Sequence, residues 1–297
     1  MPVFVLTGAN GGLGQPMLAT ILKENLILVS DLRISTTKAS SVPAEIPYSG
    51  GNVLFLVSFP SIGEARFALH RNGIDAAKAP GIRHVIYTSL SFSGPGGNIS
   101  VAQVVEAHLQ TEAYLKQSGL TYTIVCMATY AHLWNNYAGF LWLDEDPAVP
   151  VDAVLPGDGP AHWANREELG DATARIVANW VRPIHNQTLT ITGPELLTGV
   201  EILQKYLKHT GRTGGARVLP VEEAIAWHMQ YVSVPPEQAS FLDNWASWHT
   251  ANSLGESAFV DPTLERLLGR KPRPVDDQAG EIFGEGNGLD TKDLVGI

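Results

Sequence analysis

Cysteine is almost missing from this chain: among its 297 residues, only Cys126 carries a thiol. A single thiol excludes an internal disulfide bond and a metal site built from several cysteines. The first residues also lack the basic start and the small-residue cleavage site of a secretory signal. Both absences favour a reducing compartment, so we expect a cytoplasmic protein in which Cys126 is a core residue.

Long apolar runs and clusters of basic residues are missing as well. No run approaches the roughly 18 apolar residues that a membrane-spanning helix needs. Lysine and arginine number 20 against 30 acidic residues, which gives a formal net charge of -10. Nucleic-acid binding relies on clustered basic side chains. We therefore expect neither a nucleic-acid partner nor a membrane partner, and the composition leaves the oligomeric state undetermined.

A metal site is not expected either. The nine histidines are scattered along the chain, and none forms an H-x-x-x-H pair with a suitably placed carboxylate. His70, on a predicted helix, is interpreted as a helix-packing residue.

What the sequence does contain is an alternation of short apolar runs and helical patterns. The expected strands are residues 3–7, 26–30, 53–57, 84–88 and 122–126, and the expected helices between them are 15–23, 62–78 and 101–118. Right-handed crossovers place such helices over both faces of a parallel sheet. The fold class predicted is α/β, with a Rossmann-type doubly wound parallel sheet.

The pattern changes after residue 140, where proline and tryptophan become frequent. Helices are expected near residues 167–180, 199–210, 221–229 and 236–246. We expect residues 1–140 to form an NAD(P)-binding domain and residues 141–283 a smaller, mostly helical substrate lobe, interleaved with the sheet and placed over its carboxyl edge. Residues 284–297 are polar and glycine-rich, which predicts a flexible tail.

A glycine motif links the first expected strand to the first expected helix. Gly8, Gly11 and Gly14 form a G-x-x-G-x-x-G frame at this junction. The diphosphate of a dinucleotide must approach the backbone closely, and the helix N-terminus offers unpaired N–H groups and a partial positive charge. The motif in this context predicts dinucleotide binding, whereas a bare strand-to-helix turn without ligand is the alternative.

The charged residues after the second apolar run bear on the choice of cofactor. An acidic residue at this place accepts the ribose 2′-OH of NAD(H), whereas an arginine pairs with the 2′-phosphate of NADP(H). Asp31 and Arg33 both occur there, with Lys38 nearby. We expect NADP(H), with Arg33 on the phosphate. NAD(H), with these residues as ordinary loop charges, stays an alternative.

Four stretches of the chain resemble the NmrA-like branch of the atypical short-chain dehydrogenases/reductases, and within it the quinone oxidoreductases of the second type. The stretches are TGANGGLG, LFLVSFPSIGEARFALHRNGIDAAKAPGIRHVIYTSL, EAHLQTEAYLKQSGLTYTIV and WANREELGDATARIVA. Taken with the charges above, the resemblance gives the expected cofactor-binding residues, with Ser58, Phe59 and Tyr130 bordering the nicotinamide. The complete set is Gly8, Asn10, Gly11, Gly12, Leu13, Gly14, Arg33, Lys38, Ser58, Phe59, Ser89 and Tyr130.

The resemblance implies NAD(P)H-dependent hydride transfer to a quinone, an enone or a related small apolar carbonyl compound. The alternative from another class is a redox sensor, since NmrA itself is a dinucleotide-binding regulator that transfers no hydride.

The superfamily's catalytic YxxxK pair is absent from this chain. Val104 stands at the tyrosine position and His108 at the lysine position. Quinone reduction needs hydride delivery in good geometry, while the oxygens can take protons from water or a weak acid. The candidate catalytic donors are Tyr130, His132 and His108, and a purely structural role for His108 is the alternative.

Two further departures concern the pocket. Residues 126–129 replace the Arg-Pro or Arg-Asn pair usual in this family, which removes a polar anchor and predicts a more apolar pocket. Trp134, Trp142 and Trp163 are candidate walls for it, and core packing is their alternative role.

The segment near residues 39–52 is too short for a complete strand-helix unit. We expect the strand that flanks the adenine side in relatives to be lost, or reduced to a stub at residues 46–48, which leaves the adenine pocket open.

Overall fold

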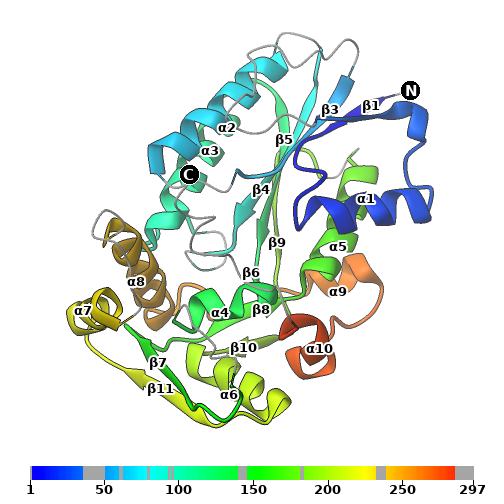
Figure 1. Ribbon diagram of the computed structural model, residues 1–297. Coiled ribbons are helices and arrows are strands. Elements are labelled where there is room, and N and C mark those ends of the chain that lie inside the picture. Colours follow the sequence, from blue (N-terminus) through cyan, green and yellow to red (C-terminus); the bar gives the residue numbers. More distant parts are fainter. Residues whose placement is uncertain are drawn as a thin grey trace.

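The computed structural model describes residues 2–35, 51–59, 63–78, 81–92, 94, 97–139, 146–180, 184–231 and 239–284 (Figure 1). Within these ranges the main sheet has six strands, in the order β2-β1-β3-β4-β5-β9, and every neighbouring pair is parallel. Its strands are β1 (Val3–Leu6), β2 (Leu32–Ile34), β3 (Gly51–Leu56), β4 (His84–Leu90), β5 (Thr121–Met127) and β9 (Gln187–Ile191). The predicted α/β class with a doubly wound parallel sheet is confirmed.

Helices cover both faces of this sheet (Figure 1). One face carries α1 (Gly14–Lys23), α5 (Arg166–Ala178) and α9 (Thr263–Leu268), and the other carries α2 (Gly63–Lys78) and α3 (Gln103–Lys116). A parallel sheet covered on both faces needs apolar side chains on both, because successive residues of a strand point to opposite faces.

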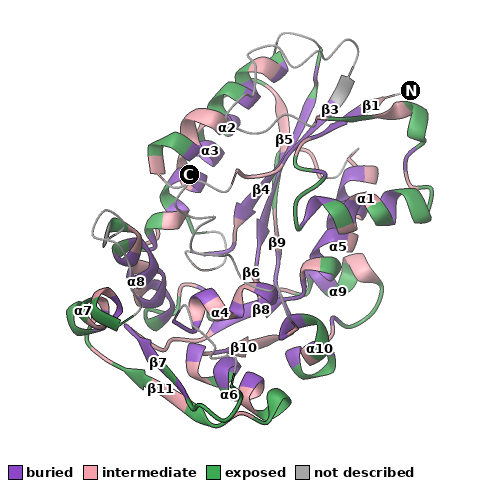
Figure 2. Cartoon of the chain, viewed as in Figure 1, coloured by how far each residue is buried: buried purple, intermediate pink, exposed green. Residues whose placement is uncertain are grey.

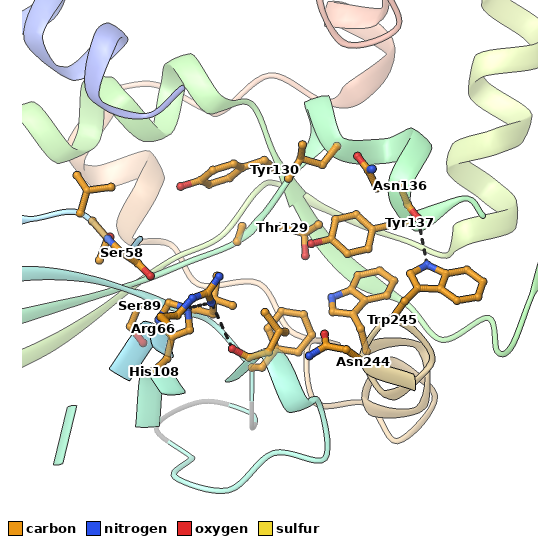
Figure 3. Close-up of a pocket in the computed structure, with 18 of the residues that line it drawn as sticks. Ser58, Arg66, Ser89, His108, Thr129, Tyr130, Asn136, Tyr137, Asn244 and Trp245 are labelled. Carbon is orange, nitrogen blue, oxygen red and sulfur yellow. Dashed lines mark hydrogen bonds between the residues drawn. The ribbon is translucent and has the colours of Figure 1, made fainter. Parts of the chain in front are cut away.

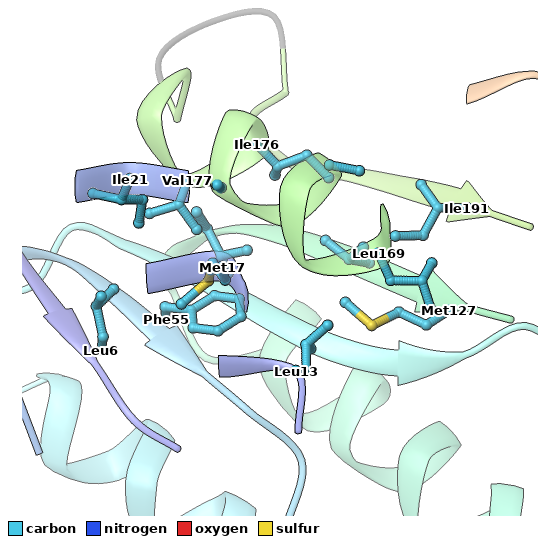
Figure 4. Close-up of a cluster of buried hydrophobic side chains, with 14 of the residues drawn as sticks. Leu6, Leu13, Met17, Ile21, Phe55, Met127, Leu169, Ile176, Val177 and Ile191 are labelled. Carbon is cyan, nitrogen blue, oxygen red and sulfur yellow. The ribbon is translucent and has the colours of Figure 1, made fainter. Parts of the chain in front are cut away.

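Strand β1 shows this alternation. Phe4 and Leu6 pack toward α1 and α5, whereas Val5 packs toward α2 and α3. On the first face, Figure 4 shows Met17 of α1 over Phe55 of the sheet, and Leu169 of α5 beside Met127. Side chains of β1 therefore belong to the cores on both faces of the sheet, and these cores anchor the strand that leads into the turn.

A smaller lobe lies over the carboxyl ends of the central strands (Figure 1). It contains a parallel pair and a three-stranded sheet in the order β10-β8-β6. The pair is β7 (Val151–Leu155) with β11 (Gly214–Val218), and the other strands are β6 (Thr129–Tyr130), β8 (Ala161–Ala164) and β10 (Glu195–Leu197). The lobe's helices are α4 (Trp134–Tyr137), α6 (Gly199–Thr210), α7 (Val221–Tyr231), α8 (Ala239–Ser253) and α10 (Ala279–Ile282). Figure 2 shows buried residues on the inward sides of these elements and exposed residues on the outward sides of α6 and α7.

The prediction of a strand at residues 26–30 is wrong. Strand β2 begins at Leu32 and follows a single 3-10 turn, Val29–Asp31. The apolar run instead closes helix α1: Asn25 has a positive φ of 51°, the Leu26 N–H donates to the Ile21 carbonyl at 3.0 Å, and Ile27 is buried in the core. Apolar residues just beyond a helix end commonly pack back against its last turn.

Part of the region after residue 140 belongs to the main sheet. Helix α5 was expected in the C-terminal lobe but packs beside α1 on the main sheet, and β9 is the edge strand of the described sheet. The chain after residue 140 is thus interleaved with the sheet.

The shortened segment is only partly described. The described sheet ends at β2, and β3 begins at Gly51. The expected stub at residues 46–48 and all but the first residue of the expected tail lie outside the described residues. Across the part of the chain that the structure describes, no helix is both long and apolar enough to cross a bilayer.

Candidate functional site

The turn between β1 and α1 is built for close backbone approach. Gly8 has a φ of 63°, in the left-handed region that favours glycine, and its carbonyl accepts the Gly11 N–H at 2.9 Å. A Cβ on Gly14 would lie 2.1 Å from that carbonyl oxygen. The start of α1 therefore sits directly against the turn, and a side chain at Gly14 would push the two apart.

The N-terminus of α1 is free to receive an anion. Its N-cap residue, Leu13, makes no side-chain capping hydrogen bond, and the first helical turn contains no acidic residue. Asn10, Gly11 and Gly12 are exposed at the same place. Unpaired N–H groups and the helix dipole favour a negatively charged group here, so the turn fits the diphosphate of a dinucleotide.

Arg166, the first residue of α5, lies over this turn. A Cβ on Gly12 would be 2.8 Å from Nη1 of Arg166, so the absence of a side chain at Gly12 makes room for the guanidinium. The sequence shows a helix start here, and Asn165 indeed caps α5 by accepting the Glu167 N–H. Nothing local singled out Arg166, because its proximity to the turn depends on the packing of α5 beside α1.

A cavity of about 270 Å³ opens at the carboxyl ends of β3, β4 and β5. It begins beside the glycine turn, because its wall includes Val57, whose Cβ would lie 3.0 Å from a Cβ on Gly8. Figure 3 shows Ser58, Arg66, Ser89 and His108 on one side of the cavity, and Tyr137, Asn244 and Trp245 on the other side.

The structure brings some of the predicted site residues to this cavity and places others elsewhere. Ser58, Ser89, His108 and Tyr130 line it. Phe59 does not line it; its backbone N–H donates to Nε2 of His70 at 3.0 Å. His132 does not line it either, and Lys38 lies outside the described residues.

Arg33 lies within β2 rather than after it, beside Val5 of β1. Its side chain is exposed, and Nη1 donates to the carbonyls of Ser30 and Leu32 at 2.8 Å each. The guanidinium of Arg33 is therefore hydrogen-bonded to backbone carbonyls of its own segment, at the edge of the described sheet.

Tyr130 is one of the two predicted donors that line the cavity, with His108. Its hydroxyl contacts the Met127 sulfur at 3.6 Å, a weak acceptor. Burial raises the pKa of this phenol, and the nearby Arg166 charge opposes the rise. The hydroxyl therefore keeps its proton at neutral pH. His132 is buried, and burial lowers its pKa to about 4, so its imidazole is neutral.

Arg66 of α2 is a buried arginine in the cavity wall that the sequence did not single out. Only 9% of its surface is exposed. Nη1 donates to Nε2 of His108 at 2.9 Å and, weakly, to the Val104 carbonyl at 3.5 Å. Among the described residues, no carboxylate forms an ion pair with Arg66, and its Nε has no hydrogen-bond partner.

The hydrogen bonds around Arg66 fix the state of His108. A guanidinium can only donate, so Nε2 of His108 accepts and its Nδ1 carries the hydrogen. Nδ1 then donates to the Tyr87 hydroxyl at 2.8 Å. Burial holds the pKa of His108 well below its usual value, in agreement with a neutral ring. The one N–H of His108 therefore points to Tyr87 and away from any ligand in the cavity.

His70 is neutral for the same kind of reason. Because the Phe59 N–H donates to its Nε2, the hydrogen of His70 sits on Nδ1 and is donated to the Thr111 hydroxyl at 2.9 Å. Burial lowers the pKa of His70 to about 3. His70 thus joins α2, α3 and the residues after β3, as expected of a packing residue.

Ser89 and Cys126 meet the carboxylate of Glu112 beneath the cavity. Ser89 donates to Oε1 at 2.7 Å, and the Cys126 thiol contacts the same oxygen at 3.9 Å. Burial raises the pKa of the Cys126 thiol, so this buried cysteine is an unreactive core residue, as predicted.

Two of the tryptophans expected to wall the pocket, Trp134 and Trp163, are core residues of the lobe. Trp134 stacks on Tyr206 with ring centres 4.3 Å apart, and Nε1 of Trp163 donates to the Leu197 carbonyl at 2.8 Å. Trp142 lies outside the described residues. The cavity is walled instead by Trp245 and Trp248, both from α8, which the sequence did not distinguish from ordinary core residues.

Comparison with known proteins adds a family and several relatives. The sequence profile of the NmrA-like family matches residues 51–253. The chain is 28% identical over 305 residues to the NmrA-like family domain-containing oxidoreductase flvB of Aspergillus flavus, covering 95% of each chain. It is 24% identical to quinone oxidoreductase 2 of Escherichia coli, covering 96% of this chain and all of the relative.

Solved structures share the fold. The crystal structure of the Escherichia coli NADPH-dependent quinone oxidoreductase with NADPH superposes with a TM-score of 0.76 at 21% identity, covering 95% of this chain and all of the other. The negative transcriptional regulator NmrA, crystallised with NADP, superposes with a TM-score of 0.66 at 17% identity, covering 97% and 98% of the two chains.

Proposed function

Because the chain belongs to the NmrA-like family, we propose that it is an oxidoreductase that uses NADPH, in preference to NADH, to reduce a quinone, an enone or a related small apolar carbonyl compound. The names of its relatives support this class: one is an oxidoreductase and another a quinone oxidoreductase crystallised with NADPH.

One observation carries the proposal, namely that the cavity starts where the glycine turn ends. Val57 both contacts the turn at Gly8 and lines the cavity. A dinucleotide whose diphosphate rests on the turn extends its nicotinamide along the carboxyl ends of the strands, as is usual in this kind of sheet. The nicotinamide then enters a cavity with room for an acceptor.

Different residues of the chain have separate roles in binding the cofactor and enclosing the cavity. Gly8, Gly11 and Gly12 let the diphosphate approach the backbone, the N-terminus of α1 and Arg166 balance its charge, and Gly14 holds the helix against the turn. The bound cofactor supplies hydride, and the lobe's apolar side chains shield the cavity from water.

Tyr130 is the candidate proton donor. It lines the cavity with its hydroxyl protonated and without a strong acceptor of its own. His108 serves better as an acceptor for Arg66, and His132 lies away from the cavity. Neither histidine is needed as an acid.

The proposal is tested by mixing the purified protein with NADPH and a panel of quinones, enones and aldehydes. Cofactor oxidation is followed by absorbance, and products are identified by mass spectrometry. We expect turnover with at least one apolar acceptor and a lower rate with NADH. Replacement of Arg166 by Gln is expected to raise the KM for NADPH. The exposed Arg83, at the opposite end of the strands, provides the matched control Arg83→Gln.

A non-catalytic redox sensor is the second candidate. It is favoured by the absence of a Tyr-Lys pair at Val104 and His108, and by the likeness of the fold to NmrA, a transcriptional regulator crystallised with NADP. Saturable dinucleotide binding without turnover of any acceptor would favour the sensor over the enzyme.

A further inference from the structure

Arg66 of α2 contacts the two positions of α3 at which the superfamily carries its Tyr-Lys pair. Val104 and His108 stand where the superfamily has tyrosine and lysine, and both contact Arg66, through the Val104 carbonyl and His108 Nε2. A permanent positive charge from α2 therefore occupies the part of α3 from which the usual catalytic groups would extend.

Among the described residues no carboxylate pairs directly with Arg66; Glu112, beneath the cavity, bonds Ser89 and Lys116 instead. The cavity wall contains no aspartate or glutamate among the described residues, and Arg66 forms no ion pair there. Its hydrogen-bond partners, a carbonyl and a neutral imidazole, are uncharged. Burying a guanidinium without a directly paired carboxylate is costly, so its position in the cavity wall suits a role toward an anionic group.

Arg66 is also held in place. His108 accepts from Nη1, and the N–H on the far side of the His108 ring donates to the Tyr87 hydroxyl. These residues connect α2, α3 and β4. A donor fixed in this way needs no rearrangement when charge develops beside it, and a site shielded from water strengthens its effect.

Resting on the proposed reductase function, we propose that Arg66 is a catalytic residue that stabilises the negative charge formed on the acceptor oxygen, and that His108 is the positioning residue that holds it. The acceptor carbon gains hydride from the reduced dinucleotide, and the electron pair of the C=O bond, directly or through a conjugated C=C bond, moves onto oxygen. The oxygen, bound to Arg66, then takes the proton of Tyr130, which water replaces. The dinucleotide leaves oxidised, and the acceptor leaves with two electrons and two hydrogens gained.

The kinetic test compares the wild type with Arg66→Met and Arg66→Lys. Loss of one oxyanion donor typically costs about 100- to 1000-fold in kcat, and we expect a loss of that order for Arg66→Met with little change in the KM for NADPH. Arg66→Lys, which keeps the charge, should recover part of the activity. In an Arg66→Ala variant, millimolar guanidinium ion should restore part of kcat. An unchanged kcat in Arg66→Met, with the wild type active, overturns the inference.

The role of His108 is tested by a matched pair. His108→Gln keeps an acceptor for Arg66 and should retain most of kcat, whereas His108→Leu removes the acceptor and should lower kcat at unchanged KM for NADPH. Equal rates for the two variants would contradict the positioning role.

A binding test separates this inference from the proposed function. Lawsone, a hydroxynaphthoquinone that is ionised at neutral pH, carries the charge that the reaction forms, and its methyl ether is the neutral control. We expect the wild type to bind the lawsone anion at least about tenfold more tightly than Arg66→Met does, with no such difference for the ether. Binding of the anion that is independent of Arg66, in variants that unfold at the wild-type temperature, overturns the inference. Arg66-dependent binding without any turnover leaves the anion site standing and rejects the reductase function.

Discussion

Removing the hydroxyl of Tyr130 tests the proposed proton transfer directly. Burial keeps its hydroxyl protonated, and the hydroxyl faces the cavity. General acids commonly contribute about 100-fold or more to rate, but quinone oxygens can also take protons from water, so we expect Tyr130→Phe to lower kcat by about 10- to 100-fold. Steady-state kinetics with a saturating acceptor measures the effect.

Tyr122→Phe is the control, because Tyr122 lies at the amino end of β5 and is only partly buried. A Tyr130→Phe variant with the kcat of this control would show that the proton comes from elsewhere.

Arg33 tests the choice between the two nicotinamide cofactors. Its guanidinium is exposed at the edge strand β2 and can leave its backbone carbonyls for a 2′-phosphate. A charge-assisted contact is worth about 1.5 to 3 kcal/mol. Arg33→Ala should therefore raise the dissociation constant of NADPH by about tenfold or more and leave that of NADH almost unchanged. Fluorescence titration of both cofactors provides the comparison, and an equal loss for both would remove Arg33 from the phosphate site.

At the scale of residues, sequence reasoning found the part of the site that is contiguous in the chain. The glycine turn was predicted because its strand, glycines and helix are adjacent. Arg66 and Arg166 were missed because each acts at a distance in sequence: Arg66 meets residues of α3, and Arg166 meets Gly12. Ser58, Ser89 and Tyr130 line the cavity, since each lies at or just beyond the carboxyl end of a strand at the same edge of the sheet.

At the scale of elements, the close contact between α1 and α5 depends on Gly170. A Cβ there would lie 2.8 Å from the Cβ of Pro16 and 2.9 Å from the Met17 nitrogen. Forcing atoms into such a contact commonly costs about 1 to 3 kcal/mol, so we expect Gly170→Ala to lower the free energy of unfolding by that amount. Urea unfolding measures it.

Gly280→Ala is the matched control for this substitution, since a Cβ on Gly280, in helix α10, meets nothing within 4 Å. It should be neutral or slightly stabilising. Equal stability of the two variants would show that α1 and α5 can move apart without cost.

Element prediction succeeded where periodicity and burial agreed. The runs behind β1, β3, β4 and β5 were identified because they are buried on both faces. Strand β2 was misplaced because its residues are largely exposed, whereas the more apolar run before it begins with Leu26 and Ile27, which pack against the end of α1. The short strands of the lobe, such as β7 and β11, pair over long sequence distances and leave no local pattern.

At the scale of the whole molecule, several histidines are buried in the neutral state, which ties stability to pH. Burial lowers the pKa of His70 and His249 to about 3, and of His84 and His132 to about 4. In the unfolded chain these groups titrate near 6.5. The stability they contribute is therefore complete above about pH 6.5 and is lost as the pH falls toward 4.

We expect the free energy of unfolding to be lower at pH 5 than at pH 7.5, by up to about 1.4 kcal/mol per pH unit for each of these histidines below pH 6.5. Urea unfolding at both pH values checks this. His84→Gln should reduce the pH dependence, because it removes one ring that is fully buried and bonded to Thr121 and Thr123. A wild-type stability that is equal at both pH values would contradict the buried neutral state.

The most direct test of the account is calorimetric titration of the protein with NADPH and with NADP⁺. If the glycine turn, the N-terminus of α1 and Arg166 receive the diphosphate, both forms will bind saturably, with one dinucleotide per chain. Arg166→Gln will then lower the affinity for NADPH and for NADP⁺ by a similar factor. No detectable binding of either form at millimolar concentration would contradict the cofactor site and, with it, the proposed reduction.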